Sequence, residues 1–205
     1  MVNDRNLGSV LVKLTNSSFA NGLAEIFLNN VDNQNNSQTF VISKVVEIED
    51  LLGFDKERLM KNLVSKIGNR YENLIIVVDF KEKFPTNAQS IELRSFRNIL
   101  DIIVEQTSVK NVVNIISEIG LDGDPDDYYR ALQYAAVINI AQAFALRLGS
   151  SNVNINSICV PQDLVSMKYS DVLGLSCSSL TKFLLSSESN NITGQTLSLS
   201  NKILR

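Results

Sequence analysis

The sequence predicts an α/β fold in which a doubly wound, mostly parallel sheet carries helices on both faces. Short runs of β-branched residues alternate along the chain with longer segments of helical periodicity, which is the pattern of βαβ units. The segment 111–161 is the clearest of these units, because its pattern indicates a strand, a loop, a long helix and a second strand. A chain of 205 residues can bury a full core, so we expect one domain spanning residues 1–205.

The long helix of this segment is expected at residues 127–148, where neither glycine nor proline occurs. Its apolar residues cover more than one face: Ala131, Leu132, Ala135, Ile138, Ala141, Phe144 and Ala145. A helix that is apolar nearly all round is buried on two sides. We therefore expect this helix to contact both its own sheet and another subunit.

The other elements follow from local patterns. Further strands are expected at 8–14, 39–48, 73–80 and 153–160, and further helices within 15–29, 55–67, 90–106 and 170–189. The helix at 55–67 is amphipathic, and its basic residues are interpreted as a solvated face rather than a binding patch. The Asn-rich segment 29–38 and the polar segment 81–88 are expected to be loops.

Composition excludes several function classes. The net charge of −3 gives no general attraction to nucleic acid or to an anionic membrane surface. No apolar run reaches the roughly 18 residues that a membrane-spanning helix needs. The first residues show no signal-peptide pattern, so the cytoplasm is the expected location.

Histidine is absent, and the two cysteines, Cys159 and Cys177, form no C-x-x-C pair. Zinc sites and Cys–His or Ser–His catalytic pairs need such residues, so the sequence argues against them. Both cysteines are expected to be small core residues.

Four signatures in a fixed order point to a known family. The strand ending N-I-I-S at Ser117 is followed by Gly120, and Tyr129 opens the long helix about a dozen residues later. The next strand, I-N-S-I-C-V-P, and the closing stretch T-G-Q-T-L from Thr193 complete the order. This arrangement resembles the short-chain dehydrogenase/reductase family, and in style most of all its β-ketoacyl-[acyl-carrier-protein] reductase branch. The resemblance implies a single Rossmann-like domain, trimmed by one strand–helix unit after Glu25 and by a shortened substrate lid after Pro161.

The same resemblance implies a catalytic Ser, Tyr and Lys that act with NADP or NAD. Ser117 and Tyr129 match, but the position of the Lys, four residues after Tyr129, holds Gln133. A phenol with a pKa near 10 needs a cation beside it to lower that pKa, and an amide carries no charge. Ser117, Tyr129 and Gln133 are therefore expected to be remnants of a catalytic site. Tyr128 is a rival for the Tyr position, and Arg130 is a nearby cation that we expect to point elsewhere on the helix.

The cofactor loop of the family is also degenerate. The glycines of its V-T-G-x-x-x-G-x-G pattern align with Leu14, Ser18 and Ala20. A glycine is needed there for a tight turn and for close approach of backbone to pyrophosphate, so this loop is not expected to bind a cofactor. Residues 15–18, including Asn16, could still bind an anion at a helix N-terminus, but simple N-capping of the helix is favoured.

One acidic residue at the end of a strand leaves two interpretations open. Asp79 follows the strand expected at 73–80 and is either a functional carboxylate or, as is more common, a loop residue.

The hypothesis that follows is a non-catalytic, short-chain dehydrogenase-like protein, or pseudoenzyme, that keeps the fold and its subunit contacts. It would form a homodimer or homotetramer, or a hetero-oligomer that supports an active paralogue, without nucleic acid, membrane or cofactor. The alternative is an NAD(P)H-dependent carbonyl or 3-oxoacyl reductase with an atypical Ser–Tyr site. A third interpretation is a binding module that uses the old cleft for another small molecule.

Overall fold

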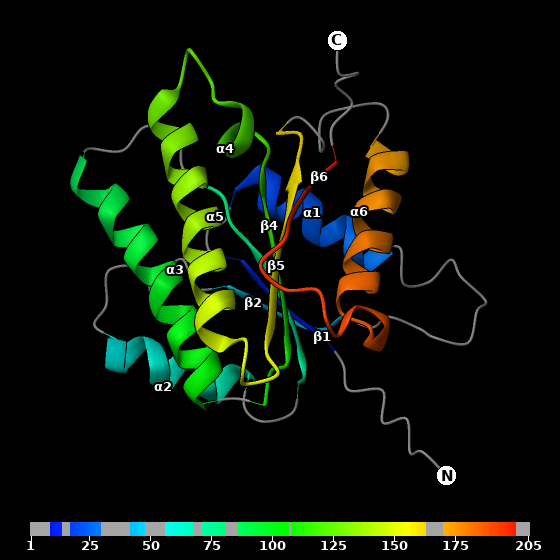
Figure 1. The fold of residues 1–205 in the computed structure, drawn as a ribbon. Helices are drawn as coiled ribbons and strands as arrows, with labels where there is room; N and C mark the ends of the chain where they lie inside the picture. Colours follow the sequence, from blue (N-terminus) through cyan, green and yellow to red (C-terminus); the bar gives the residue numbers. More distant parts are fainter. Residues whose placement is uncertain are drawn as a thin grey trace.

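A parallel sheet forms the centre of the chain. The computed structural model describes residues 9–13, 17–29, 42–47, 56–67, 71–80, 86–106, 108–162 and 170–199. Within these ranges the sheet has six strands, all parallel, in the order β2-β1-β3-β4-β5-β6 (Figure 1). Their bounds are β1 Ser9–Lys13, β2 Ile42–Glu47, β3 Asn73–Val77, β4 Asn111–Ser117, β5 Asn154–Val160 and β6 Thr196–Ser198.

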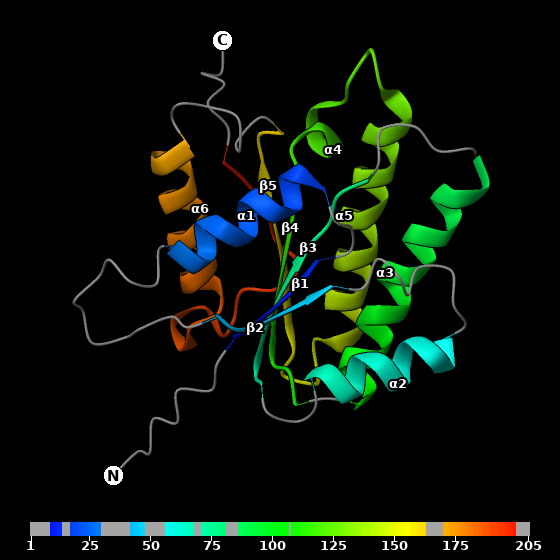
Figure 2. The ribbon, with the colours of Figure 1, turned by 180° about the vertical axis from the view of Figure 1, so that it is seen from behind.

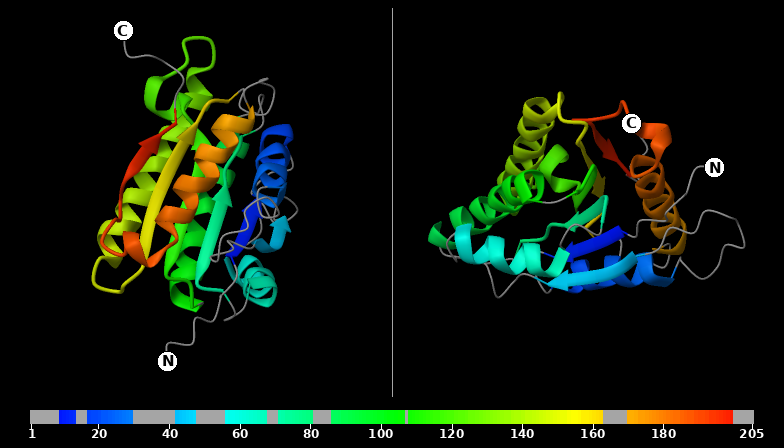
Figure 3. Two further views of the ribbon diagram at one scale, coloured as in Figure 1. Left: turned by 90° about the vertical axis from the view of Figure 1, so that its right-hand side faces the viewer. Right: turned by 90° about the horizontal axis from the view of Figure 1, so that it is seen from below.

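Helices cover both faces of this sheet, which confirms the doubly wound prediction. Their bounds are α1 Ser18–Asn29, α2 Lys56–Ile67, α3 Thr86–Gln106, α4 Ile119–Asp122, α5 Tyr128–Leu148 and α6 Ser170–Leu184, followed by a 3-10 turn at Ser187–Ser189. Figures 1 and 2 show α1 and α6 on one side, and α2, α3 and α5 on the other. The right-hand view in Figure 3, seen from below, shows the same two layers of helices on either side of the sheet.

Alternation along each strand produces the two cores. Val10 and Val12 of β1 face the core under α2, α3 and α5, whereas Leu11 between them faces the core under α1 and α6. Successive side chains of a strand point to opposite faces, so a strand covered on both sides must be apolar throughout. The β-branched runs in the sequence are the direct consequence.

The strand order explains which unit is trimmed. In the doubly wound order 3-2-1-4-5-6, the strand beside the first is the second in sequence. Here β2 pairs with β1 and is the edge strand of the described sheet. The strand predicted at 39–48 therefore takes the place of the second strand. The predicted loop at 29–38 and the shortened lid lie largely outside the described residues.

A ladder of amides fixes the register at the amino ends of three strands. Asn73, Asn111 and Asn154 stand opposite one another in β3, β4 and β5. The Asn111 amide donates to Asn73 Oδ1 at 3.0 Å and accepts from Asn154 Nδ2 at 3.2 Å. Cross-strand pairs of this kind stabilise one register over its neighbours.

Three elements differ from the predictions. The loop after Ser117 contains a short helix, α4; β3 ends at Val77 instead of continuing to Phe80; and α3 begins at Thr86, inside the segment 81–88 that was expected to be a loop. The second difference has a local cause, because the Asp79 side chain accepts a hydrogen bond from the Phe80 N–H at 2.9 Å and so turns the chain away from the ladder.

The helix α5 forms where it was predicted, but its outer side is open in the single chain. Ten of its residues are buried, while Leu132 and Leu146 are 62% and 85% exposed. Among the described helices, α5 is the one whose length and composition would allow it to cross a membrane, yet half of that apolar stretch is buried. Its apolar character is therefore that of a core helix lying on a sheet.

The two cysteines are core residues, as predicted. Cys159 of β5 belongs to the core under α5, and Cys177 of α6 belongs to the core on the opposite face. Burial raises the pKa of each thiol to about 12, and for Cys159 the nearby Glu118 and Asp122 add to the effect.

These thiols predict a specific alkaline loss of stability. From about pH 9 upward the unfolded chain releases both thiol protons, whereas the native protein keeps them until about pH 12, so stability falls as pH rises. Each thiol should remove about 1.4 kcal/mol of unfolding free energy by about pH 10. Urea unfolding near neutral pH and near pH 10 measures this. The Cys159→Ala/Cys177→Ala variant should lose less stability than the natural chain, and equal losses would contradict the assignment.

Candidate functional site

The carboxyl edge of the sheet gathers the polar residues of the domain. Ligands of doubly wound sheets bind at this edge, beside the point where the strand order reverses. That point lies between β1 and β3, because the chain runs from β1 to β2 on one side and then crosses to β3 on the other. The residues described at this edge include Lys13, Asp79, Ser117 and Gln162.

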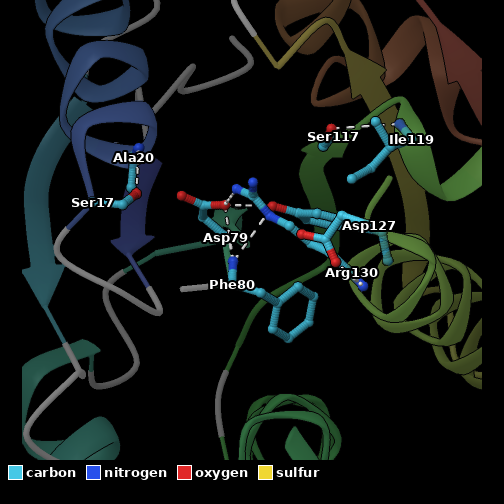
Figure 4. Close-up of polar contacts among 9 residues, drawn as sticks. Ser17, Ala20, Asp79, Phe80, Ser117, Ile119, Asp127 and Arg130 are labelled. Atoms are coloured by element: carbon cyan, nitrogen blue, oxygen red, sulfur yellow. Dashed lines mark hydrogen bonds and ion pairs between the residues drawn. The ribbon is translucent and has the colours of Figure 1, made fainter. Parts of the chain in front are cut away.

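A buried cluster around Asp79 occupies this edge. One oxygen of Asp79 accepts three hydrogen bonds: from the Tyr134 hydroxyl, from Arg130 Nη2 at 3.0 Å and from the Phe80 N–H at 2.9 Å. Asp79 is 4% exposed, Arg130 8% and Tyr134 fully buried. The Phe80 ring packs edge-on against Tyr134, with ring centroids 4.9 Å apart. Figure 4 shows Asp79 and Arg130 facing each other across the end of β3.

The start of α5 aims Arg130 into this cluster. Asp127 caps the helix by accepting from the Arg130 N–H at 3.2 Å, which fixes where the first turn begins. Tyr134 lies four residues later and therefore on the same side of the helix, with the guanidinium 5.8 Å from its ring centre. Arg130 is buried against Asp79 whereas Tyr129 is half exposed, so the two side chains point to different sides of the helix, as expected. The Gln162 amide oxygen, with the amide turned to face it, also accepts from the guanidinium.

The electrostatics of the cluster keep the phenol protonated. Burial raises the pKa of Tyr134, the negative charge of Asp79 raises it further, and the opposing effect of Arg130 is smaller. Burial opposes the charge on Arg130, but Tyr134 and Asp79 more than offset this, so the pKa of Arg130 is raised. The cluster is thus a neutral phenol and an ion pair, and neither proton is released near neutral pH.

The three residues predicted to be catalytic remnants differ in how far they are exposed to solvent. Ser117 is 1% exposed at the end of β4, and its Oγ accepts from the Ile119 N–H at 3.4 Å, which holds the turn into α4 (Figure 4). Tyr129 is 52% exposed and its ring lies 4.1 Å from that of its neighbour Tyr128. Gln133 is 6% exposed, and its buried Nε2 has no hydrogen-bond partner among the described residues. Their catalytic role stays a prediction.

At the start of α1, groups that could bind a cofactor phosphate form hydrogen bonds within the protein instead. Leu14 and Asn16 lie outside the described residues. Ser18 is the exposed first residue of α1, and the buried Ala20 donates its N–H to Ser17 Oγ at 3.0 Å, which is the expected N-cap (Figure 4). The Lys13 ammonium donates to Asn21 Oδ1 at 2.6 Å. These residues do not fit a nicotinamide dinucleotide, since the cap takes a helix N–H and Ser18 adds a side chain where backbone should approach phosphate.

The Asp79–Arg130–Tyr134 cluster was missed in the sequence, although a signal was present. Arg130 and Tyr134 supply a cation and a phenol four residues apart, which is the spacing of the family's Tyr and Lys in reverse order. The helix cap at Asp127 decides which such pair faces the sheet. In the described part of the chain no group of three or more His, Cys, Asp or Glu side chains is placed to hold a metal ion.

Comparisons with known proteins support the fold. The chain superimposes on a short-chain dehydrogenase family protein from Francisella tularensis with a TM-score of 0.62 and 14% identity, over 94% of this chain and 96% of that one. It also matches the enoyl-acyl-carrier-protein reductase of Plasmodium berghei, solved with triclosan, with a TM-score of 0.65 and 14% identity, over 95% and 96% of the two chains. No protein-family model and no curated protein matches the sequence.

Removing the Asp79 carboxylate should destabilise the fold more than removing the Tyr134 hydroxyl. Asp79→Ala leaves Arg130 buried without its carboxylate and should cost about 3–5 kcal/mol. Tyr134→Phe keeps the ring and loses one hydrogen bond to a charged group, about 1.5–3 kcal/mol. Urea unfolding of both variants measures the difference. As a control, the double variant Asp79→Leu/Arg130→Leu removes both charges and should recover part of the unfolding free energy lost in Asp79→Ala. An Asp79→Ala variant as stable as Tyr134→Phe, or more stable, would refute the assignment.

Proposed function

We propose that this chain, which has the fold of the short-chain dehydrogenases/reductases, is a non-catalytic protein that retains that fold and its surfaces for subunit association. It binds neither NADP nor NAD, and it acts in the cytoplasm as a homo-oligomer or as a subunit that supports an active paralogue.

The Asp79–Arg130–Tyr134 cluster is the observation that carries this proposal. Carbonyl reduction by this type of fold needs a phenol whose proton is released easily and a hydride donor beside it. The buried phenol at the carboxyl edge is Tyr134, and its hydroxyl donates to a carboxylate that raises its pKa. The cation beside it, Arg130, is paired with the same carboxylate. The cluster therefore stabilises the protein in the place where a reductase would hold reactive groups.

The first turn of α1 supports the same conclusion. Ser17 caps the helix and Lys13 is bonded to Asn21 within the same turn. A cofactor would have to break these contacts before its phosphates met the helix N-terminus.

The outer side of α5 supports the association role. Ala136, Ile140 and Ala143 follow one another at spacings of four and three residues and form an apolar stripe that the chain leaves at least partly uncovered. At the end of this stripe Arg147 donates to Asp101 of α3 at 2.8 Å, so α3 and α5 present one continuous surface. A second copy, or a paralogue with the same helix pair, would bury it.

The cytoplasmic location is supported by the two buried, unpaired cysteines. The thiols of Cys159 and Cys177 form no disulfide and lie in separate cores. Free cysteines of this kind are ordinary in reducing compartments.

Thermal unfolding with and without millimolar NADPH or NADH tests the loss of cofactor binding. We expect no shift of the melting temperature with either nucleotide. A binder at about 100 times its dissociation constant gains about 2.7 kcal/mol, which is a shift of several degrees for a domain of this size. An active short-chain dehydrogenase serves as the positive control. A clear shift here would overturn the proposal in favour of the atypical reductase, whose activity should then depend on Tyr129 in a Tyr129→Phe comparison.

The mass of the protein in solution, measured by light scattering after size exclusion, tests the association surface. We expect at least a dimer, and we expect Ala143→Arg to reduce it to single chains, because the new charge would be buried at the contact. Ser179→Arg, at an exposed position on α6 across the sheet, is the matched control and should keep the natural mass. If the natural chain is a monomer in solution, the homo-oligomer is excluded. In that case, capture of an active paralogue by the natural chain but not by Ala143→Arg would establish the hetero-oligomer.

A further inference from the structure

A groove lies between α4 and the first half of α5. These two helices are neighbours in Figure 1. Its volume is about 670 Å³, and three large apolar side chains line it: Leu121 from α4 and Tyr128 and Leu132 from α5. These side chains are 47%, 54% and 62% exposed. Several of the largest exposed apolar side chains of the described chain therefore share one concave surface, which is a feature of binding sites rather than of an ordinary surface.

The walls of this groove are fixed by close packing and by side-chain caps. Gly120 of α4 lies so near α5 that a Cβ atom there would stand 2.6 Å from Cβ of Tyr134. In the loop between the helices, Asp124 Oδ1 accepts from the N–H groups of Asp126 and Asp127 at 2.9 and 3.3 Å. The Tyr128 ring stacks on Tyr129. The groove is consequently formed before any partner arrives, which lowers the entropic cost of binding.

The border of the groove is acidic. Asp122 and Asp124 line it, and Asp126 is exposed in the adjoining loop. The described residues that line it include no lysine and no arginine. An apolar floor with carboxylates beside it complements a ligand that carries apolar groups flanked by cations.

The shape of the floor favours a helix over a small molecule. Tyr128, Leu132 and Ala135 of α5 line the groove at spacings of four and three residues, which forms a ridge of the kind that packs against a second helix. A small-molecule pocket would instead bring a few buried polar groups together to orient its ligand. Here the carboxylate of Asp122 belongs to an exposed residue.

We propose that this groove docks a basic amphipathic helix of a partner protein, with apolar residues on one face and Lys or Arg on its flanks. The inference goes beyond the proposed association of α5 with a second copy. The groove is built from α4 and the start of α5, and it lies apart from the first turn of α1, so nucleotide binding and helix docking succeed or fail separately.

Fluorescence anisotropy with two designed probes tests the proposal. One labelled peptide of about 16 residues carries leucines at helical spacing with lysines on the flanks, and its twin carries glutamates in place of the lysines. The lysine peptide should bind at least about tenfold more tightly than the glutamate peptide, and should weaken as salt is raised. Leu121→Lys should lower its affinity at least about tenfold, because it places a cation on the apolar floor.

Val172→Lys is the matched control, since Val172 is 66% exposed on α6, across the sheet from the groove. It should leave binding unchanged, and light scattering on the same samples should show one oligomeric state throughout. Equal binding of the two peptides, or equal loss in Leu121→Lys and Val172→Lys, would overturn the proposal. Binding of an apolar dye that Leu121→Lys abolishes, with no binding of either peptide, would assign the groove to a small molecule and overturn it as well.

Discussion

The buried carboxylate of Asp79 is the constraint on which the carboxyl edge of the sheet and the start of α5 depend. A carboxylate that is 4% exposed is tolerated only when its charge is paired and its oxygens are satisfied. Arg130 supplies the charge, and the Tyr134 hydroxyl and the Phe80 N–H supply further donors. The same contacts end β3, orient the first turns of α5 and bring Tyr134 against the Phe80 ring. One side chain thus joins the centre of the sheet to the helix that covers it.

The position of Tyr134 in turn determines how the short helix α4 packs. Tyr134 is fixed by Asp79 on one side, and on the other its Cβ lies where any side chain at Gly120 would clash. The short helix α4 is therefore held against α5, and Ser117 accepts the Ile119 N–H that begins it. Gly120 lines the groove between α4 and α5, so one wall of this groove packs directly on Tyr134. No sequence pattern indicated α4, and its packing depends on the close approach of Gly120 to Tyr134 on a different helix.

The sequence predicted the fold well, because the fold depends on patterns that are local. The β-branched runs became strands buried on both faces, and the glycine-free segment became α5 with its boundaries nearly as expected. The resemblance to the short-chain dehydrogenases/reductases agrees with structural neighbours at 14% identity, where the fold alone is shared. The candidate site was less predictable, because it depends on helix rotation. Moving the cap by one residue would exchange Arg130 for Tyr129 on the inner face, and periodicity cannot resolve a single residue in an all-round apolar helix.

The cluster fills the carboxyl edge of the sheet with satisfied contacts. Catalytic sites, by contrast, hold groups in protonation states and positions that cost stability. A phenol and a cation four residues apart are present here in reverse order, and their charges and protons are directed at Asp79 instead of outward. One buried group near the cluster is not satisfied, because the amide nitrogen of Gln133 has no hydrogen-bond partner in the described core. Such a group costs about 1–3 kcal/mol. An apolar residue of similar volume in place of Gln133 is therefore expected to stabilise the protein.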